Sequence, residues 1–434
     1  MHISEDFLHF IWQNQLAGRK FSLITGEICE VLHPGNGGNK DGPDFEAGQI
    51  SINGLKLVGH IEIHLKSSDW FLHKHHLDPA YEKVILHVVS KHDKEVLDIN
   101  NRTIPVLELK MDTLIKWKEH YESIRMSNHS PFICSEYLSK LPQKLVREVL
   151  QKKGEQRLVE KAEKINELFK ASNFNWDECL YRLLMRDFGL NKNMEAMSML
   201  AESLPWRIIA KEREKLLSVE ALLFGQAGLL KDLSDENEYF QELKNEYKYL
   251  SHKHKLKAIS PRVWKYAPLR PSAMPDFRIA QIAALFHSIP NLNSQVQSLS
   301  SKEWMKVFSQ NASLYWQTHF TFAGKESKNR NTKPGNAFLE LLFINSIAPY
   351  LYAWADETLQ DSKKEFAVQV LKNCSAESNK IIHTFVNELS YGLNSALESQ
   401  GLIHLYKELC SVRKCLKCPF IKELMNLQGN HECA

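Results

Sequence analysis

Residues 50–65 read ISINGLKLVGHIEIHL, and this stretch decides the fold of the N-terminal part of the chain. Apolar and polar residues alternate on both sides of Asn53-Gly54, which predicts two half-buried strands. An Asn-Gly pair between two such runs is typical of a type I′ turn, so the two strands are expected to pair antiparallel. Residues two positions apart on a strand share a face, which places Glu62 and His64 side by side.

One helix and further strands are predicted around this hairpin. Residues 4–18 begin with Ser-Glu-Asp and carry apolar residues at helical spacing up to a glycine, which predicts a capped amphipathic helix. Short apolar or β-branched runs predict strands at 31–32 and 84–89 and a fifth strand at 103–109. From about Met111 onward, apolar residues recur every three or four positions, which is typical of helices.

The patterns together predict an α+β protein with three parts. The first is an α/β domain that carries 10 of the 19 histidines of the chain. The second is a large all-α region that can hold two subdomains, and the third is a cysteine-rich C-terminal segment. The predicted boundaries are 1–112, 113–405 and 406–434.

The composition of the 434 residues excludes several classes of protein. A hydrophobic fraction of 43% and a charged fraction of 25% argue against disordered, collagen-like and membrane-embedded chains. No apolar run approaches the length of a membrane span, and the N-terminus lacks the basic and apolar regions of a secretory signal. Eight cysteines are too few for a disulfide framework, so we expect a protein of the reducing cytoplasm with no membrane partner. The oligomeric state stays open.

Two acidic residues form the first candidate site. Asp44 lies at the entry to the strand before the Asn53-Gly54 turn, and Glu62 lies in the strand after it. Carboxylates that converge from adjacent strands suit Mg²⁺ or Mn²⁺, which would polarise a phosphodiester and lower the pKa of an attacking water. The alternative is that Asp44 belongs to a turn, and that Glu62 and His64 form a surface pair.

Histidines follow this hairpin densely. We expect Asp69, His73 and His75 to surround the same cleft as Asp44, and the strand at 84–89 adds His87. A second hypothesis is a zinc site that hydrolyses a substrate other than nucleic acid. A solvated polar loop is the third possibility. The residues of the zinc hypothesis are His73, His75, His76 and Asp78.

Three cysteines near the C-terminus form the second candidate site. Cys410, Cys415 and Cys418 have C-x4-C-x2-C spacing, which occurs in plant-type iron–sulfur proteins and in some zinc knuckles. We expect a structural iron–sulfur cluster or Zn²⁺ here. The fourth ligand stays open between Cys433 and Cys134, and a metal-free set of thiols is the alternative.

A basic stretch in the helical region is a candidate nucleic-acid surface. Residues 251–275 contain six basic residues and no acidic one, with aromatic residues between them. Such a stretch can neutralise phosphates and stack on bases, or it can form an ordinary solvated face. The residues expected to bind nucleic acid, whether DNA or RNA, are Lys253, Lys255, Arg262, Trp264, Lys265, Arg270 and Arg278.

The hairpin motif resembles a known signature. Pro43-Asp44, seventeen intervening residues and Glu62-Ile63-His64 resemble the PD-(D/E)XK nuclease motif, with His64 where that family usually has lysine. The resemblance implies a restriction-endonuclease-like fold, Asp44 and Glu62 as catalytic metal ligands, and His64 as a third ligand or proton carrier. Glu5 in the first helix corresponds to an additional acid of that family. Some nucleases of this superfamily hold an iron–sulfur cluster, which is consistent with the cysteine spacing.

A second resemblance extends over nearly the whole chain. The stretches that carry it are 42–45, 62–64 through 68–70, His73, His75, 86–89, 225–228, 270–271 through 278–281 and the Cys410 segment. Through these stretches the chain resembles a bacterial family named domain of unknown function 2851. This resemblance implies that both candidate sites belong to one architecture, and it implies no activity.

Our leading hypothesis is a divalent-metal-dependent nuclease. The alternative is a non-catalytic helical nucleic-acid-binding or interaction protein with a structural metal site.

Overall fold

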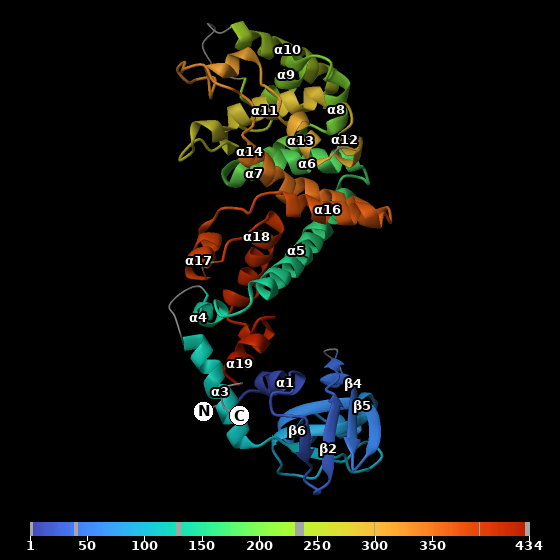
Figure 1. Cartoon of the computed structure of the whole chain (residues 1–434). Coiled ribbons are helices and arrows are strands. Elements are labelled where there is room, and N and C mark those ends of the chain that lie inside the picture. Colours follow the sequence, from blue (N-terminus) through green and yellow to red (C-terminus); the bar gives the residue numbers. More distant parts are fainter. Residues whose placement is uncertain are drawn as a thin grey trace. The chain divides into compact units, whose positions relative to one another are not determined.

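The computed structural model describes residues 3–38, 42–126, 132–230, 238–298, 300–389 and 391–429. It confirms the predicted α+β class, because a sheet near the N-terminus is followed by helices (Figure 1). The chain forms two compact units. The first unit contains Met1–Val149, His383–Tyr391 and Leu405–Ala434, and the second contains Leu150–Ile382 and Gly392–His404.

The sheet of the first unit has the strand order β1-β2-β4-β5-β6-β7, and β3 pairs with β4 off this path. The strands from β1 to β5 pair antiparallel, whereas β6 is parallel to both β5 and β7. Strands β1 and β3 were not predicted, because runs of three and two residues are too short to show a period. The bounds are β1 (Lys20–Ser22), β2 (Ile28–His33), β3 (Asn36–Gly37), β4 (Phe45–Ile52), β5 (Leu55–Lys66), β6 (Val84–Lys91) and β7 (Val106–Glu108).

The predicted hairpin is confirmed. Ile52 pairs with Leu55 across the turn, and Asn53 and Gly54 have φ angles of 47° and 91°. Two successive positive φ angles are required by a type I′ turn, which explains why Asn-Gly occupies it. This turn fixes the register of β4 on β5 and therefore the neighbours of Glu62.

Helix α1 (Glu5–Gln13) packs against β5. It buries the apolar face that contains Phe7 and Ile11 and ends earlier than the predicted Gly18. The side chain of Ser4 makes no capping hydrogen bond, although Ser4 is the residue that precedes the helix. Between β5 and β6 the chain forms three short helices, α2 (Asp69–Leu72), η1 (His75–Leu77) and η2 (Pro79–Tyr81).

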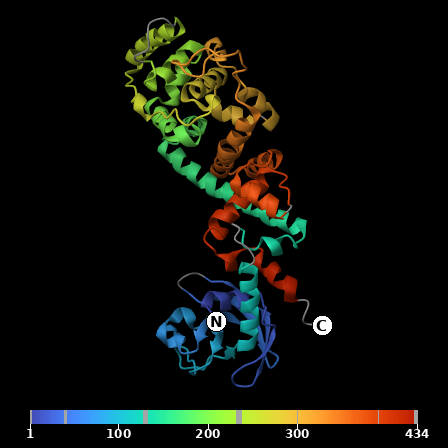
Figure 2. The same ribbon diagram turned by 90° about the vertical axis from the view of Figure 1, so that its left-hand side faces the viewer.

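The rest of the first unit is helical. After the sheet come α3 (Met111–Met126) and α4 (Ser135–Leu138), and the C-terminal segment adds η7 (Tyr406–Cys410), η8 (Cys415–Lys417) and α19 (Ile421–Gly429). Helix α19 packs on α3, which brings the red end of the ribbon beside its cyan part in both views (Figures 1 and 2). The same unit therefore contains the predicted N-terminal domain and the predicted cysteine segment.

The second unit is built from helices around one large core. Among its described residues, Phe224, Trp304, Trp316 and Tyr350 are completely buried. The long helices that begin or lie in this unit are α5 (Gln143–Ala171), α6 (Trp176–Phe188), α7 (Leu190–Ser203), α8 (Trp206–Glu212), α9 (Leu216–Gln226), α10 (Glu238–His254), α11 (Pro275–Ser288), α12 (Leu292–Ser298), α13 (Ser301–Phe308), α14 (Asn336–Leu342), α15 (Ala348–Glu357), α16 (Asp361–Asn373), α17 (Lys380–Leu389) and α18 (Ala396–Leu405).

One stretch of this unit, Asn336–Glu357, is long and apolar enough to cross a membrane by length and composition. In the structure, 72% of its most apolar window is buried among other helices. Such burial is typical of a core helix, because a helix of this composition must cover its apolar surface.

Candidate metal centre

Strand β5 presents Glu62 and His64 on one face, as predicted from their spacing. Both side chains are buried, with exposed fractions of 5% and 2%. The neighbouring strand places Asp44 beside them. The Asp44 backbone N–H donates to Glu62 Oε2 at 3.1 Å, and the backbone N–H of Ile63 donates to Asp44 Oδ2 at 2.9 Å.

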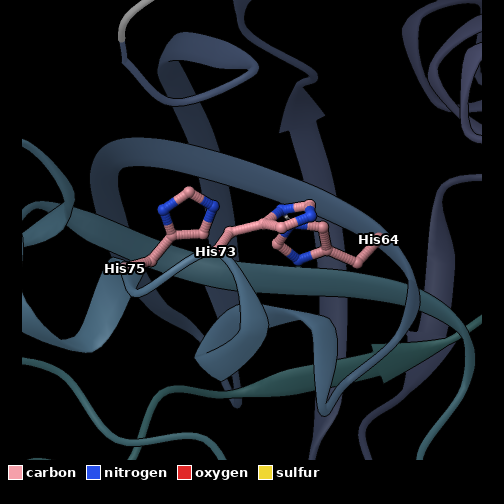
Figure 3. Close-up of side chains that lie close together, drawn as sticks. All are labelled: His64, His73 and His75. Atoms are coloured by element: carbon pink, nitrogen blue, oxygen red, sulfur yellow. Dashed lines mark hydrogen bonds between the residues drawn. The ribbon is translucent and has the colours of Figure 1, made fainter.

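The connection between β5 and β6 brings two more histidines to His64. Lys74 has a left-handed backbone with a φ of 63°, and the chain turns there between His73 and His75. His64 Nε2 lies 3.0 Å from His73 Nδ1, and one ring nitrogen from each of the three histidines lies within 4.8 Å of the others (Figure 3). We call His64, His73 and His75 the histidine cluster.

Glu62 borders the histidine cluster. Its Oε1 lies 3.2 Å from His75 Nε2 and 3.6 Å from His64 Nε2. Three imidazole nitrogens therefore lie together, and a carboxylate oxygen lies close to two of the three rings. This donor set can hold a divalent cation, and its imidazole nitrogens suit Zn²⁺.

Other side chains fix the orientation of these rings. His64 Nδ1 lies 2.9 Å from His87 Nε2, so the second nitrogen of His64 is held by β6. The ring of His75 stacks on Tyr81 with centroids 3.8 Å apart and meets the edge of Trp70. Metal-binding histidines usually have such a partner, which selects the tautomer and the ring orientation.

His64 and His87 are neutral near pH 7. Burial, together with the neighbouring imidazoles, lowers the pKa of His64 to about 3, and burial does the same for His87. Neutral imidazole is the form that binds a metal ion. Burial raises the pKa of Glu62, and the contact with His75 opposes this effect.

Helix α1 contributes Glu5 and His9 near Asp44. His9 Nε2 lies 3.2 Å from Asp44 Oδ2, and this contact raises the pKa of His9 although burial acts in the opposite direction. Burial also raises the pKa of Glu5. His9 was missed from the sequence, although it lies one helical turn after Glu5 and so shares its face.

Three residues of the sequence hypotheses serve the backbone or the packing instead. Asp69 Oδ2 accepts from the backbone N–H of Lys66 at 2.9 Å and closes the turn after β5. Asp78 accepts from the backbone N–H of Ala80, and His76 packs on Phe71. The hypothesis of a zinc site with His76 and Asp78 therefore requires correction, because the group of described ligand atoms that lie within 4.8 Å of one another in this connection contains His64, His73 and His75 without these two residues.

A family model described as Protein of unknown function (DUF2851) matches residues 5–380. The chain belongs to this family. The match includes the whole histidine cluster and Cys134, and it ends before Cys410. No curated protein and no solved structure matched the chain.

The structure brings the predicted cysteines together in the first unit. Cys410, Cys415 and Cys418 line one cavity, and Cys134 lines the same cavity. Cys433, the other candidate for the fourth ligand, lies outside the described residues.

The predicted nucleic-acid-binding residues of the second unit fall into two groups. Trp264 and Arg278 are buried. In the core, the Trp264 indole N–H donates to the Ala227 carbonyl, and the Arg278 guanidinium lies over the ring of Phe338. These two residues are therefore corrected from surface contacts to core residues. Lys253 is exposed and lies 2.7 Å from Glu212. The remaining exposed members are Lys255, Arg262, Lys265 and Arg270.

Proposed function

We propose that the chain is a metal-dependent hydrolase of phosphodiesters whose catalytic metal is held by the histidine cluster. The observation that carries this proposal is the gathering of three imidazoles beside the carboxylate of Glu62. Three histidine ligands with an adjacent carboxylate leave a coordination position open, as catalytic zinc sites do. His73 is exposed, so the site has an entrance on that side.

The donor set favours Zn²⁺ over the Mg²⁺ or Mn²⁺ expected from the sequence. Mg²⁺ prefers oxygen ligands, whereas imidazole nitrogen suits Zn²⁺ and related transition-metal ions. A bound cation would supply polarisation of the phosphoryl oxygen and a lowered pKa for a nearby water. We therefore assign the metal site to imidazole ligands and leave the carboxylates free for proton transfer.

Glu62 and His9 divide the proton transfers in this proposal. Glu62 accepts the proton of the attacking water, a role that its burial and raised pKa favour. The contact with Asp44 raises the pKa of His9, which favours His9 as the donor of a proton to the leaving oxygen. Asp44 is thus a positioning residue, since one of its carboxylate oxygens already contacts both His9 and the Ile63 backbone.

Nucleic acid is the substrate class that we propose. The order of helix, antiparallel hairpin with Asp44 and Glu62, and buried following strand is the order that the PD-(D/E)XK resemblance implies. The exposed basic residues of 251–275 support binding of a polyanion. A cytoplasmic location agrees with this substrate and with the reduced cysteines, and it stays a prediction.

A metal-binding and cleavage assay tests the proposal. Calorimetric titration of the full chain with Zn²⁺, Mn²⁺ and Mg²⁺ is paired with cleavage of labelled single- and double-stranded DNA and RNA. We expect His64→Ala and His73→Ala to lose the N-terminal Zn²⁺ and the cleavage. His76→Ala is the matched control, because His76 lies in the same connection outside the cluster. Cleavage that survives loss of the histidine cluster would overturn the proposal.

A non-catalytic nucleic-acid-binding protein is the second candidate function. The burial of His64 and Glu62 favours it, because structural zinc sites are closed and use four protein ligands. The same assays separate the two functions. Tight Zn²⁺ binding and salt-dependent nucleic-acid binding without cleavage of any substrate would establish this second function.

A further inference from the structure

Four cysteines from distant parts of the sequence surround one cavity in the first unit. Cys134 precedes α4, Cys410 ends η7, Cys415 begins η8 and Cys418 follows it. The other lining residues are mainly apolar, and they include Ile124, Phe132, Leu409, Ile421 and Leu424. We call Cys134, Cys410, Cys415 and Cys418 the cysteine cluster.

The local backbone directs three of these thiols to the same side. Arg413 has a left-handed φ of 56°, and the Lys414 backbone N–H donates to the Leu409 carbonyl at 2.9 Å, so the chain reverses after Cys410. The Cys418 N–H then donates to the Cys415 carbonyl at 2.9 Å. These two turns within nine residues bring the sulfur atoms of the three C-terminal cysteines to one cavity.

We propose that the cysteine cluster ligates an iron–sulfur cluster, with Cys134 as the fourth ligand. The four cysteines line one cavity whose other walls are mainly apolar. Such a cavity suits an iron–sulfur cluster, in which several iron and sulfide atoms lie between the thiolates. A single Zn²⁺ with Zn–S bonds of about 2.3 Å would instead draw the four sulfurs to about 3.8 Å from one another.

The sequence spacing agrees with this assignment. The C-x4-C-x2-C spacing of the three C-terminal cysteines is one that iron–sulfur proteins use. In this chain the fourth ligand precedes the other three by more than half of the sequence.

The position of the cluster points to a structural role. Element η8 packs on α1, and His120 Nε2 of α3 lies 3.1 Å from the Met425 carbonyl of α19. The rings of Phe7 in α1 and Tyr121 in α3 pack together, with their centroids 5.9 Å apart. The cluster thus fastens the C-terminal segment to the helix that carries Glu5 and His9, independently of whether the histidine cluster is catalytic.

The test is the iron and sulfide content of the full chain purified without oxygen. We expect about four iron and four sulfide atoms per chain, or two of each for the smaller cluster, together with broad visible absorption that dithionite bleaches. Mössbauer spectroscopy distinguishes the two cluster types. Zinc without sulfide, or no metal at these thiols, would overturn the proposal.

Three single variants test the fourth ligand. Cys134→Ser should lose most of the iron and sulfide, whereas Cys433→Ser and Cys374→Ser should retain both, because Cys374 is a buried residue of the second unit. Circular dichroism shows whether the variants fold. If Cys134→Ser does not fold, Cys134→Ala is used instead. It is reconstituted with iron in the presence of excess small-molecule thiol, which can supply the missing sulfur ligand. Wild-type iron content in Cys134→Ser, or its loss in Cys433→Ser, contradicts the assignment of Cys134.

Discussion

Glu62 is the residue on which the proposed chemistry depends most. Its side chain is 5% exposed, and its two oxygens have different partners. One oxygen accepts from the Asp44 backbone, and the other faces His64 and His75. One oxygen is therefore held by a hydrogen bond, and the other faces the histidine cluster. This is the geometry of a general base.

We predict that Glu62→Gln keeps the metal and loses the reaction. The amide preserves the size of the side chain but cannot accept a proton, so cleavage should fall by about 10²- to 10⁴-fold. Zinc affinity, measured by calorimetric titration, should change by less than about tenfold. If Glu62→Gln abolishes zinc binding, Glu62 is a metal ligand, as first expected from the sequence.

The sequence could predict the part of this site that lies on strands. A period of two placed Glu62 and His64 on one face, and the hairpin register placed Asp44 next to them. The approach of His73 and His75 could not be predicted, because it depends on the left-handed residue Lys74 and on short helices without a periodic signal. Cys134 was named only as one of two possible fourth ligands, since nothing local connects it to Cys410.

At the scale of elements, α9 and α10 of the second unit enclose a carboxyl group that the proposed chemistry does not use. Burial raises the pKa of Glu220 to about 7, although Tyr239 and Ser313 donate to it. Its Oε1 has no hydrogen-bond partner. A helix core that contains one protonated carboxyl group is sensitive to pH near neutrality.

We predict that the stability of the second unit falls as the pH rises from about 4.5 to above 7. The pKa of Glu220 is higher in the folded state than its ordinary value of 4.5, so the folded state binds the proton more tightly. The stabilisation is complete below pH 4.5 and is lost as the pH rises through about 7, a change of about 3 kcal/mol.

Glu220→Gln should remove most of this pH dependence in urea unfolding followed at several pH values. Glu214→Gln is the matched control, because Glu214 is 84% exposed and near the same helices. An unchanged slope of stability against pH in Glu220→Gln would show that Glu220 is not protonated in the folded chain.

At the scale of the whole molecule, the two ends of the sequence belong to one unit. Local periodicity predicted the sheet, its hairpin and the long helical region, which are all local features. The packing of α19 on α3 joins residues about three hundred positions apart, and no local pattern encodes such a contact. The sequence therefore predicted segments 1–112 and 406–434 as separate parts, whereas the structure places both in the first unit.

We predict that loss of the iron–sulfur cluster destabilises the first unit and leaves the second unit unchanged. A cross-link that closes so long a loop stabilises the folded state by about 3 kcal/mol or more. Its removal by oxidation and chelation should lower the unfolding temperature of the first unit by about 5–10 °C in calorimetry. If the unfolding temperatures of both units fell equally, the cluster would not be a cross-link that stabilises only the first unit.

Anomalous diffraction from crystals of the full chain, grown anaerobically with Zn²⁺, tests the central claim most directly. We predict a zinc peak bonded to His64 Nε2, His73 Nδ1 and His75 Nε2, with Glu62 beside it, and a separate iron peak at the cysteine cluster. Zinc at the cysteines with none at the histidines would contradict the proposed catalytic centre.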